Sequence, residues 1–269
     1  MVEYPFMQHD QLTMQLDSRF TLVRIYHQLC VVQLQRMLTH ETNNALTGLS
    51  GYAQMALRLR KEETYLKAAE AFNEGLAALQ RQQQHVNFFA REAPDELNPM
   101  DPMVSIRMVS ELLTNYLSKR NIRLDIRVEK SGVIDGNPVL LGMVVLSCVW
   151  DAAGRILQEG GAGRLQISLH RQDNRVCLHF RDSARQPWTL RPQTCSATLS
   201  LADTSDLRFA LASPTLAIIA GILGGHWSST DESSDRELVL TIPCLRPMQG
   251  SDRPSTPDSP VPHPSPPEK

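Results

Sequence analysis

The stretch of sequence that decides the fold spans residues 38–53 and reads LTHETNNALTGLSGYA. Through and around it, apolar residues recur at steps of three, four or eight positions, which is the spacing of one face of a long α-helix. They are Val31, Leu34, Leu38, Leu46, Leu49, Ala53 and Leu57. His40 stands two positions after Leu38, about 200° around a helix of 3.6 residues per turn, so we expect its imidazole to point outward.

Two polar side chains accompany His40 on this predicted helix. Glu41 follows it, and Asn44 lies one turn further on, where side chains four residues apart are neighbours. A neutral imidazole is a nucleophile at physiological pH, and an acceptor beside its second nitrogen fixes the tautomer. Glu41 is the candidate acceptor, and Asn44 could hold a phosphoryl oxygen or an attacking water. The pattern predicts phosphoryl transfer through histidine; the alternative is an ordinary surface histidine.

Residues 40–52, HETNNALTGLSGY, resemble the phosphoacceptor box of bacterial two-component histidine kinases, in the subgroup written H-E-x-N-N-P-L-x-x-I-x-G-Y. The resemblance implies that His40 is phosphorylated, that Glu41 is its acid/base neighbour, and that Asn44 serves the kinase and phosphatase steps. The proline of the family is Ala45 here. We therefore expect a weaker bend after the histidine, because alanine continues a helix that proline would kink.

Composition excludes several classes of protein. The chain has 269 residues, 42% hydrophobic residues and a net charge of -2, which describes an ordinary soluble protein of two modest domains. The sequence contains no stripe of basic residues, so it does not predict nucleic-acid binding. The five cysteines form no C-x-x-C motif, so we expect neither a metal site nor disulfides. This predicts that the protein resides in a reducing cytosol. The N-terminus lacks a signal pattern and the longest apolar run, 139–150, is too short for a bilayer, which predicts a cytoplasmic protein without membrane contact.

The N-terminal part, residues 1–93, is predicted to be a helical hairpin. Its first helix should begin near Asp10 or Asp17 and end near Arg60, with a turn at 61–64 before the second helix. The second helix carries its own apolar stripe, Tyr65, Ala68, Phe72, Leu76, Leu79, Val86 and Phe89. Two such helices cannot bury both stripes alone, so we expect a homodimer that forms a four-helix bundle. Phe88 and Phe89 are expected to anchor the next domain, and the alternative is that they are simple core aromatics.

Three further segments follow. Residues 94–102 contain three prolines and read as a linker, and residues 246–269 contain eight prolines and read as a disordered tail. Between them, residues 103–245 alternate between helix and strand patterns. Helices are predicted from Val104, over 138–156 and over 207–223, the last with Pro214 in its first turn. Strands are predicted at 122–128, 165–169, 176–180 and 238–242, which indicates a mixed or antiparallel sheet with helices over one face.

That order also resembles the ATP-binding domain of histidine kinases. The resemblance implies an α plus α/β fold, in which the dimeric hairpin is followed by an ATPase-like α/β sandwich. Ser147 and Asp151 stand where the family has Mg²⁺-binding asparagines, and Asp182 stands at the adenine-contacting aspartate. The glycines of the family's nucleotide loops are missing after Asp182 and at 213–219. Glycines let backbone N–H groups approach phosphates, so we expect ATP binding to be lost and no cofactor to be held.

Without ATP, His40 must exchange its phosphoryl group with a receiver-domain aspartate, which supplies the Mg²⁺. The layout resembles the kinase-like histidine phosphotransferases of phosphorelays, whose partners are receiver domains of response regulators or hybrid kinases. Gly48, Gly51, Tyr52 and Met55 are the predicted docking surface, although packing inside the dimer would explain the two glycines equally well. Two alternatives stay open: an active histidine kinase with a divergent ATP site, and a non-catalytic scaffold that binds response regulators. His85, His170, His179 and His226 are expected to be packing or surface residues.

Overall fold

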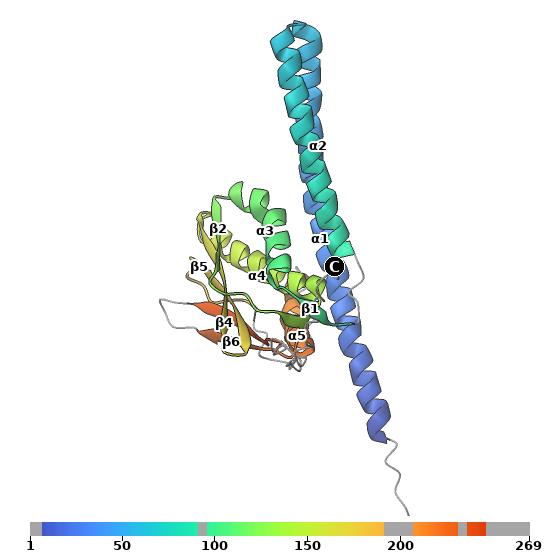
Figure 1. The fold of residues 1–269 in the computed structure, drawn as a ribbon, viewed down its shortest axis with the longest axis vertical. Helices are drawn as coiled ribbons and strands as arrows, with labels where there is room; N and C mark the ends of the chain where they lie inside the picture. The colour runs from blue at the N-terminus through green and yellow to red at the C-terminus, as the bar shows by residue number, and fades with distance from the viewer. Residues whose placement is uncertain (1–6, 91–95, 191–206, 231–235, 246–269) are drawn as a thin grey trace, which may run out of the picture.

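The computed structural model describes residues 7–90, 96–190, 207–230 and 236–245. The predicted tail at 246–269 lies outside the described residues, as does the segment 191–206. Within them the chain forms a long helical hairpin followed by an α/β domain, in the order that the sequence predicts (Figure 1).

Helix α1 (Met7–Leu59) and helix α2 (Glu62–Ala90) form the hairpin. The turn lies at Arg60 and Lys61, slightly earlier than predicted, and Arg60 takes a positive φ of 50°. Helix α1 runs through Ala45 without a break, as expected for alanine in place of proline. The two helices approach closely because α2 has Gly75 opposite α1; a Cβ there would lie 2.9 Å from Leu49 Cδ1.

The apolar stripe of α1 divides into two halves. Leu34 and Leu38 are buried within the chain, whereas Leu46 is 49% exposed and Leu57 is 67% exposed. Helix α2 also has an exposed apolar residue toward the far end of the hairpin, Phe72, whose exposed fraction is 55%. The far end of the hairpin therefore carries an apolar side that none of the described residues covers.

The α/β domain contains a five-stranded mixed sheet with the strand order β2-β4-β5-β7-β6. Strand β2 (Ile122–Val128) is parallel to β4 (Gly163–Gln172); the neighbouring pairs among β4, β5 (Arg175–Asp182), β7 (Glu237–Pro243) and β6 (His226–Thr230) are antiparallel. Strands β4 and β5 meet at Asp173, which takes a positive φ of 55°. Strand β1 (Asn98–Met100) pairs with β3 (Ile134–Gly136) apart from this sheet.

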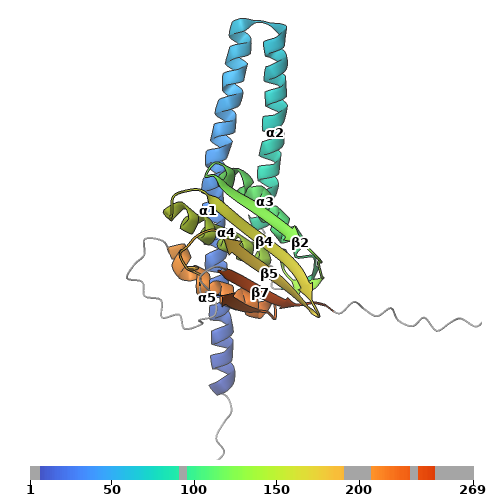
Figure 2. The same ribbon diagram turned by 90° about the vertical axis from the view of Figure 1, so that its left-hand side faces the viewer.

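Three helices cover one face of the sheet: α3 (Met103–Ser118), α4 (Pro138–Gln158) and α5 (Leu207–Ile222). In Figure 2 the sheet faces the viewer and the helices lie behind it, with α1 behind them. This confirms the predicted mixed sheet with helices over one face. Helix α4 starts as predicted, because the Asn137 side chain accepts hydrogen bonds from the backbone N–H groups of Val139 (2.8 Å) and Leu140 (3.3 Å).

The structure differs from the sequence prediction in three short strands and in the position of Pro214. Strands β1, β3 and β6 were not predicted, because they have three to five residues each and are defined by the partner strand rather than by alternation. Strand β1 lies inside the segment predicted as linker, 94–102. Pro214 lies in the middle of α5 and not in its first turn. Helix α5 continues past the proline because its apolar side is buried on both sides of it, at Leu211 and Leu216.

The hairpin and the α/β domain share one hydrophobic core. Val23, Tyr26 and Cys30 of α1 are buried together with residues of α4 and α5. Phe88 and Phe89 pack on α4, where a Cβ at Gly142 would come within 3.1 Å and 3.2 Å of their rings. The prediction that these phenylalanines anchor the next domain is confirmed.

Polar contacts accompany this apolar junction. Tyr26 Oη lies 2.6 Å from Ser147 Oγ of α4, and His27 Nε2 lies 2.6 Å from the Phe89 carbonyl oxygen. These two contacts join α1, at Tyr26 and His27, to helix α4 of the domain and to the end of helix α2.

Among the described residues, one helix has the length and hydropathy to cross a membrane. It is α4, and 89% of its most apolar window is buried inside the protein. It serves here as the central core helix of the α/β domain.

Candidate functional site

His40 lies on the exposed side of α1, above the part of the helix that packs on the α/β domain. Asn44, also exposed, is one turn further along, and its Nδ2 lies 3.1 Å from His40 Nδ1. The amide nitrogen donates to Nδ1, so in the neutral ring the proton is on Nε2. His40 therefore faces outward, as predicted, with the amide beside its ring.

Glu41 does not contact His40. Gln82 Nε2 of α2 donates to Glu41 Oε2 at 3.4 Å, and Lys119 Nζ, next to the end of α3, lies 3.6 Å from Glu41 Oε1. One residue further along a helix is 100° around it, which turns the carboxylate toward α2 and α3. The expected role of Glu41 as acceptor for the ring is thus not seen in this arrangement, where Asn44 occupies the place beside Nδ1.

Three of the four predicted docking residues, Gly48, Gly51 and Met55, lie on the side of α1 that carries His40, and Tyr52 lies about 120° around the helix from it. Gly48, Gly51, Tyr52 and Met55 follow at helical spacing and are exposed. From His40 to Met55 the surface extends about 22 Å at 1.5 Å per residue. A Cβ at Gly48 or Gly51 would meet nothing within 4 Å. Packing within this chain therefore gives no reason for the two glycines.

Asp151 and Asp182, the two carboxylates assigned to a nucleotide site by the resemblance, both bind Arg155. Arg155 Nε donates to Asp151 Oδ2 at 3.0 Å, and another guanidinium nitrogen donates to Asp182 Oδ2. The three side chains are only 1–2% exposed. A third guanidinium nitrogen donates to the Gln186 carbonyl oxygen at 2.9 Å, and the group lies 4.0 Å from the Trp188 ring centroid.

The electrostatics of this buried cluster follow from two carboxylates sharing one cation. Burial raises the pKa of Asp151 to about 6, although Arg155 acts in the opposite direction. Burial also raises the pKa of Asp182, again against the effect of Arg155. Asp151 Oδ1 is buried without a hydrogen-bond partner. The carboxylates thus neutralise an internal arginine and neither is presented to solvent.

Ser147, the other α4 residue at a family asparagine position, is also used internally. It is buried, bonds Tyr26 of α1, and donates to the Met143 carbonyl oxygen at 2.6 Å. Sequence reasoning did not find Arg155, Trp188 or Tyr26. For Arg155 a signal was present, since it stands four residues after Asp151 on one face of a helix. The contacts of Trp188 and Tyr26 come from tertiary packing alone.

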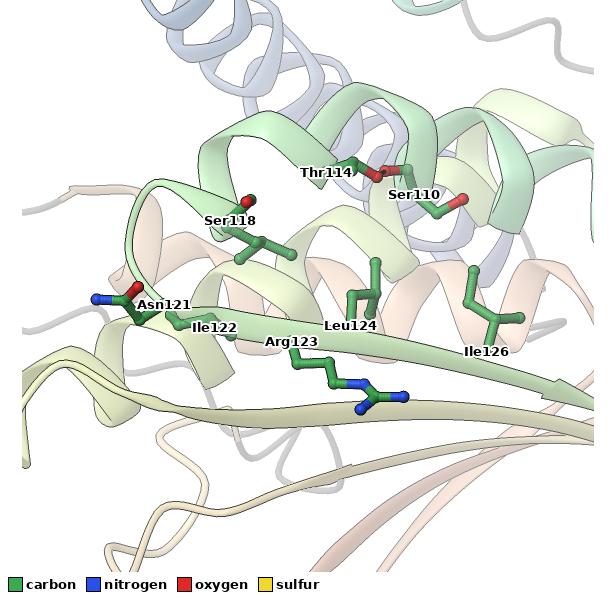
Figure 3. Close-up of a pocket in the computed structure, with 9 residues that line it drawn as sticks. Ser110, Thr114, Ser118, Asn121, Ile122, Arg123, Leu124 and Ile126 are labelled. Carbon is green, nitrogen blue, oxygen red and sulfur yellow. Dashed lines mark hydrogen bonds between the residues drawn. The ribbon is translucent and has the colours of Figure 1, made fainter.

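A groove between α3 and the edge strand β2 lies elsewhere in the domain (Figure 3). Ser110, Thr114 and Ser118 line it from α3, and Leu124 and Ile126 line it from β2. None of the residues that line this groove was predicted to be a functional residue.

Replacing Arg155 tests the buried cluster. We expect Arg155→Ala to lower the free energy of unfolding by about 3–5 kcal/mol, because it leaves two buried carboxylates unpaired. The matched control is Arg164→Ala, which removes an arginine that is 54% exposed and paired with Asp125; its expected cost is about 0–1 kcal/mol. Urea unfolding of the three proteins measures both values. Equal losses would contradict a special role for Arg155.

The raised pKa of Asp151 predicts a pH dependence. The folded protein takes up a proton at Asp151 near pH 6, whereas the unfolded chain does so only at about pH 4. A group with a raised acid pKa stabilises the fold as the pH falls, so wild type should gain about 1 kcal/mol relative to Asp151→Asn between pH 7 and pH 5. Denaturation of both proteins at the two pH values measures the difference. A difference that stays constant with pH would show that Asp151 does not titrate in this window.

No protein-family model and no curated protein sequence matches the chain. The solved structures that it resembles are histidine kinases, both catalytic domains and longer chains. The Acinetobacter baumannii histidine kinase AdeS is 13% identical over 77% of this chain and 98% of its own, with a TM-score of 0.41. The catalytic domain of the histidine kinase ThkA is 17% identical over 55% of this chain and 97% of its own, with a TM-score of 0.42.

A longer ThkA chain, solved in complex with the response regulator protein TrrA, is 18% identical over 79% of this chain and 61% of its own, with a TM-score of 0.44. At these identities and TM-scores the likeness concerns the general arrangement of helices and strands. It assigns neither an activity nor a partner to this chain.

Proposed function

We propose that this chain is a cytoplasmic histidine phosphotransfer protein of a two-component phosphorelay, which passes a phosphoryl group between His40 and the aspartate of a receiver domain. The observation that carries the proposal is the outward-facing His40 with the Asn44 amide 3.1 Å from its Nδ1. The surface continues over Gly48 and Gly51, which are open to a partner. A nucleophile on a convex, accessible helix suits a reaction whose second reactant is another protein.

The chemistry requires a turn of the amide and a change of tautomer in the ring. Nε2 releases its proton to solvent and Nδ1 takes one up, and a 180° turn of the Asn44 amide presents its oxygen to the new Nδ1–H, which leaves the lone pair on Nε2. Nε2 then attacks the phosphorus of a receiver aspartyl phosphate. The new P–N bond forms, the P–O bond to the aspartate breaks, and the aspartate leaves as a carboxylate. The Asn44 oxygen stabilises the positive charge that develops on the ring, and a Mg²⁺ held by the receiver neutralises the phosphoryl oxygens.

Two features of the α/β domain support a donor other than ATP. Arg155 pairs with both Asp151 and Asp182, so neither carboxylate is available to a cation or to adenine. Ser147 is turned to Tyr26 of α1, which covers this part of α4. In this proposal the α/β domain keeps the layers of an ATPase-like sandwich, does not bind ATP, and stabilises the hairpin by packing against it.

The two glycines are assigned to partner docking and not to packing within a dimer. On a helical wheel Gly51 and Gly48 lie about 20° and 80° from His40 in one direction, whereas the exposed apolar residues Leu46 and Leu57 lie about 120° and 100° from it in the other direction. The apolar side is the natural dimer surface and the His40 side stays free. Gly48 and Gly51 let a receiver approach the backbone of α1 beside the histidine.

We further propose that the hairpin dimerises through this apolar side. On the helical wheel of α1, Leu46 and Leu57 lie on the same side as Thr39. On the wheel of α2, Phe72 lies on the same side as Gln83. A groove lined by both Thr39 and Gln83 places the two sides together on one face of the hairpin. A second hairpin packed there would complete a four-helix bundle and would leave His40 outside it.

The exchange of phosphate at His40 is tested with two donors in separate tubes. One contains the purified chain, Mg²⁺ and labelled ATP; the other contains the chain and receiver domains of the same organism that have been phosphorylated with labelled acetyl phosphate. We expect acid-labile, base-stable phosphohistidine only in the second tube, and none with His40→Gln. Asn44→Ala should slow the transfer at least about tenfold, because it removes the group that orients the ring.

The matched control for this exchange is His226→Gln, which changes an exposed histidine of β6 and should transfer phosphate as wild type does. Label on His40 from ATP would instead identify an active kinase. Absence of label from both donors, across the whole set of receivers, would identify a non-catalytic scaffold. Either result contradicts the proposed phosphotransfer.

Dimerisation is tested by placing a charge on the apolar side of the hairpin. Sedimentation of wild type at micromolar concentration should give a dimer, and Phe72→Glu should give a monomer, because an unpaired carboxylate cannot be buried between hairpins. Val104→Glu, at a site on α3 that is 49% exposed, is the control and should remain dimeric. A monomeric wild type, or a dimeric Phe72→Glu variant, would contradict this interface.

A further inference from the structure

His170, Cys177 and His179 gather on the face of the sheet opposite to the one that α3, α4 and α5 cover. In the antiparallel register of β4 and β5, His170 is directly opposite Cys177, and His179 lies two residues beyond Cys177, on the same face of the sheet. One ligand atom from each of the three side chains lies within 4.8 Å of the other two. Two imidazoles and a thiol are thus brought to one point by a β-hairpin.

The surroundings of His179 orient it as a metal ligand is oriented. His179 Nδ1 lies 2.6 Å from Glu237 Oε1 of β7, and Arg181 Nε donates to the same carboxylate oxygen at 2.7 Å. Nδ1–H therefore donates to Glu237, which leaves the lone pair on Nε2. His179 Nε2 is buried and has no hydrogen-bond partner. A carboxylate behind one nitrogen and an open lone pair on the other is the arrangement that metal-bound histidines show.

The Cys177 thiol and the His170 ring complete the cluster. Cys177 is a free thiol and only 6% exposed, and its nearest polar contact is Thr241 Oγ1, at the long distance of 4.0 Å. The His170 ring stacks on the His179 ring with their centroids 4.5 Å apart. A buried polar atom without a partner is costly, and its presence calls for an explanation. A bound cation would supply the missing partner of His179 Nε2.

We propose that His170, Cys177 and His179 form a Zn²⁺ site on the outer face of the sheet. Two nitrogens and one sulfur suit Zn²⁺, which binds tetrahedrally to histidine and cysteine, with water in the fourth position. Bonds of about 2.0–2.3 Å place tetrahedral ligands about 3.3–3.8 Å apart, so the side chains close by about 1 Å on binding. The Zn–S bond forms as the Cys177 thiol loses its proton to solvent.

Such an ion would act on the domain and not on His40. It would join β4 to β5 and, through Glu237, fix the pairing of β5 with β7. Because Zn²⁺ binds the folded hairpin and not the dispersed ligands of the unfolded chain, binding would raise the stability of the α/β domain. This proposal departs from the expectation of no metal site, because the ligands are brought together by the β4–β5 turn and not by a local sequence motif.

The experiment titrates the reduced full-length chain with Co²⁺, a spectroscopic substitute for Zn²⁺, and then displaces it with Zn²⁺. We expect a sulfur-to-cobalt charge-transfer band at one equivalent, its loss on adding Zn²⁺, and a higher melting temperature with Zn²⁺ but not with Mg²⁺. Cys177→Ser should abolish the band. His170→Gln and His179→Gln should each weaken Zn²⁺ binding, measured by competition with a chromophoric chelator, at least about tenfold.

Matched controls separate this site from other ligands in the chain. Cys244→Ser and His226→Gln change a half-buried thiol and an exposed imidazole outside the cluster and should bind as wild type does. Glu237→Gln should keep the charge-transfer band and weaken binding about 10–100-fold, because Glu237 positions His179 without touching the metal. Circular dichroism confirms that each variant is folded. A band that persists in Cys177→Ser, or binding lost in either control, would overturn the assignment.

Discussion

The structure depends on the burial of one side of α1, from Val23 to Leu38, in the core that it shares with the α/β domain. Val23, Tyr26 and Cys30 lie in the same hydrophobic core as α4 and α5. Removing this much apolar surface from water outweighs any single polar contact in the molecule. It also fixes where the domain can sit: beside the first part of the hairpin, with α3 reaching as far as Glu41 through Lys119. His40, one residue before Glu41 but on another side of the helix, stays outside.

The same docking explains why one residue at the expected nucleotide positions has another partner: with α1 on α4, Ser147 faces Tyr26 and not solvent. The two aspartates are occupied from within the α/β domain, where Arg155 pairs with Asp151 one turn before it and with Asp182 at the end of β5. Buried ion pairs contribute little net stability when the cost of desolvation is included, yet they are costly to break. The cluster therefore holds α4, β5 and the segment of Trp188 in one arrangement.

The molecule presents three surfaces with different chemistry. The side of α1 with His40 and Asn44 is polar and open, the neighbouring side of the hairpin is apolar and uncovered, and the outer face of the sheet carries histidines beside a thiol. Because helical residues one position apart are turned by 100°, a single hairpin can keep its reactive side and its association side separate. The helices of the α/β domain separate both from the outer face of the sheet.

Local patterns in the sequence determined the long elements. Three features could be predicted because they depend on residues that are close in the sequence. They are the apolar stripes of α1 and α2, the Asn-Pro start of α4, and the alternating pattern of strands β4 and β5. The outward position of His40 belongs to the same class, because it depends only on the helical period. Tertiary structure decided the short strands β1, β3 and β6, the position of Glu41 away from the imidazole, the pairing of Arg155 with two aspartates, and the meeting of His170, Cys177 and His179. Each of these joins side chains or backbone from separate elements, and only packing sets those distances.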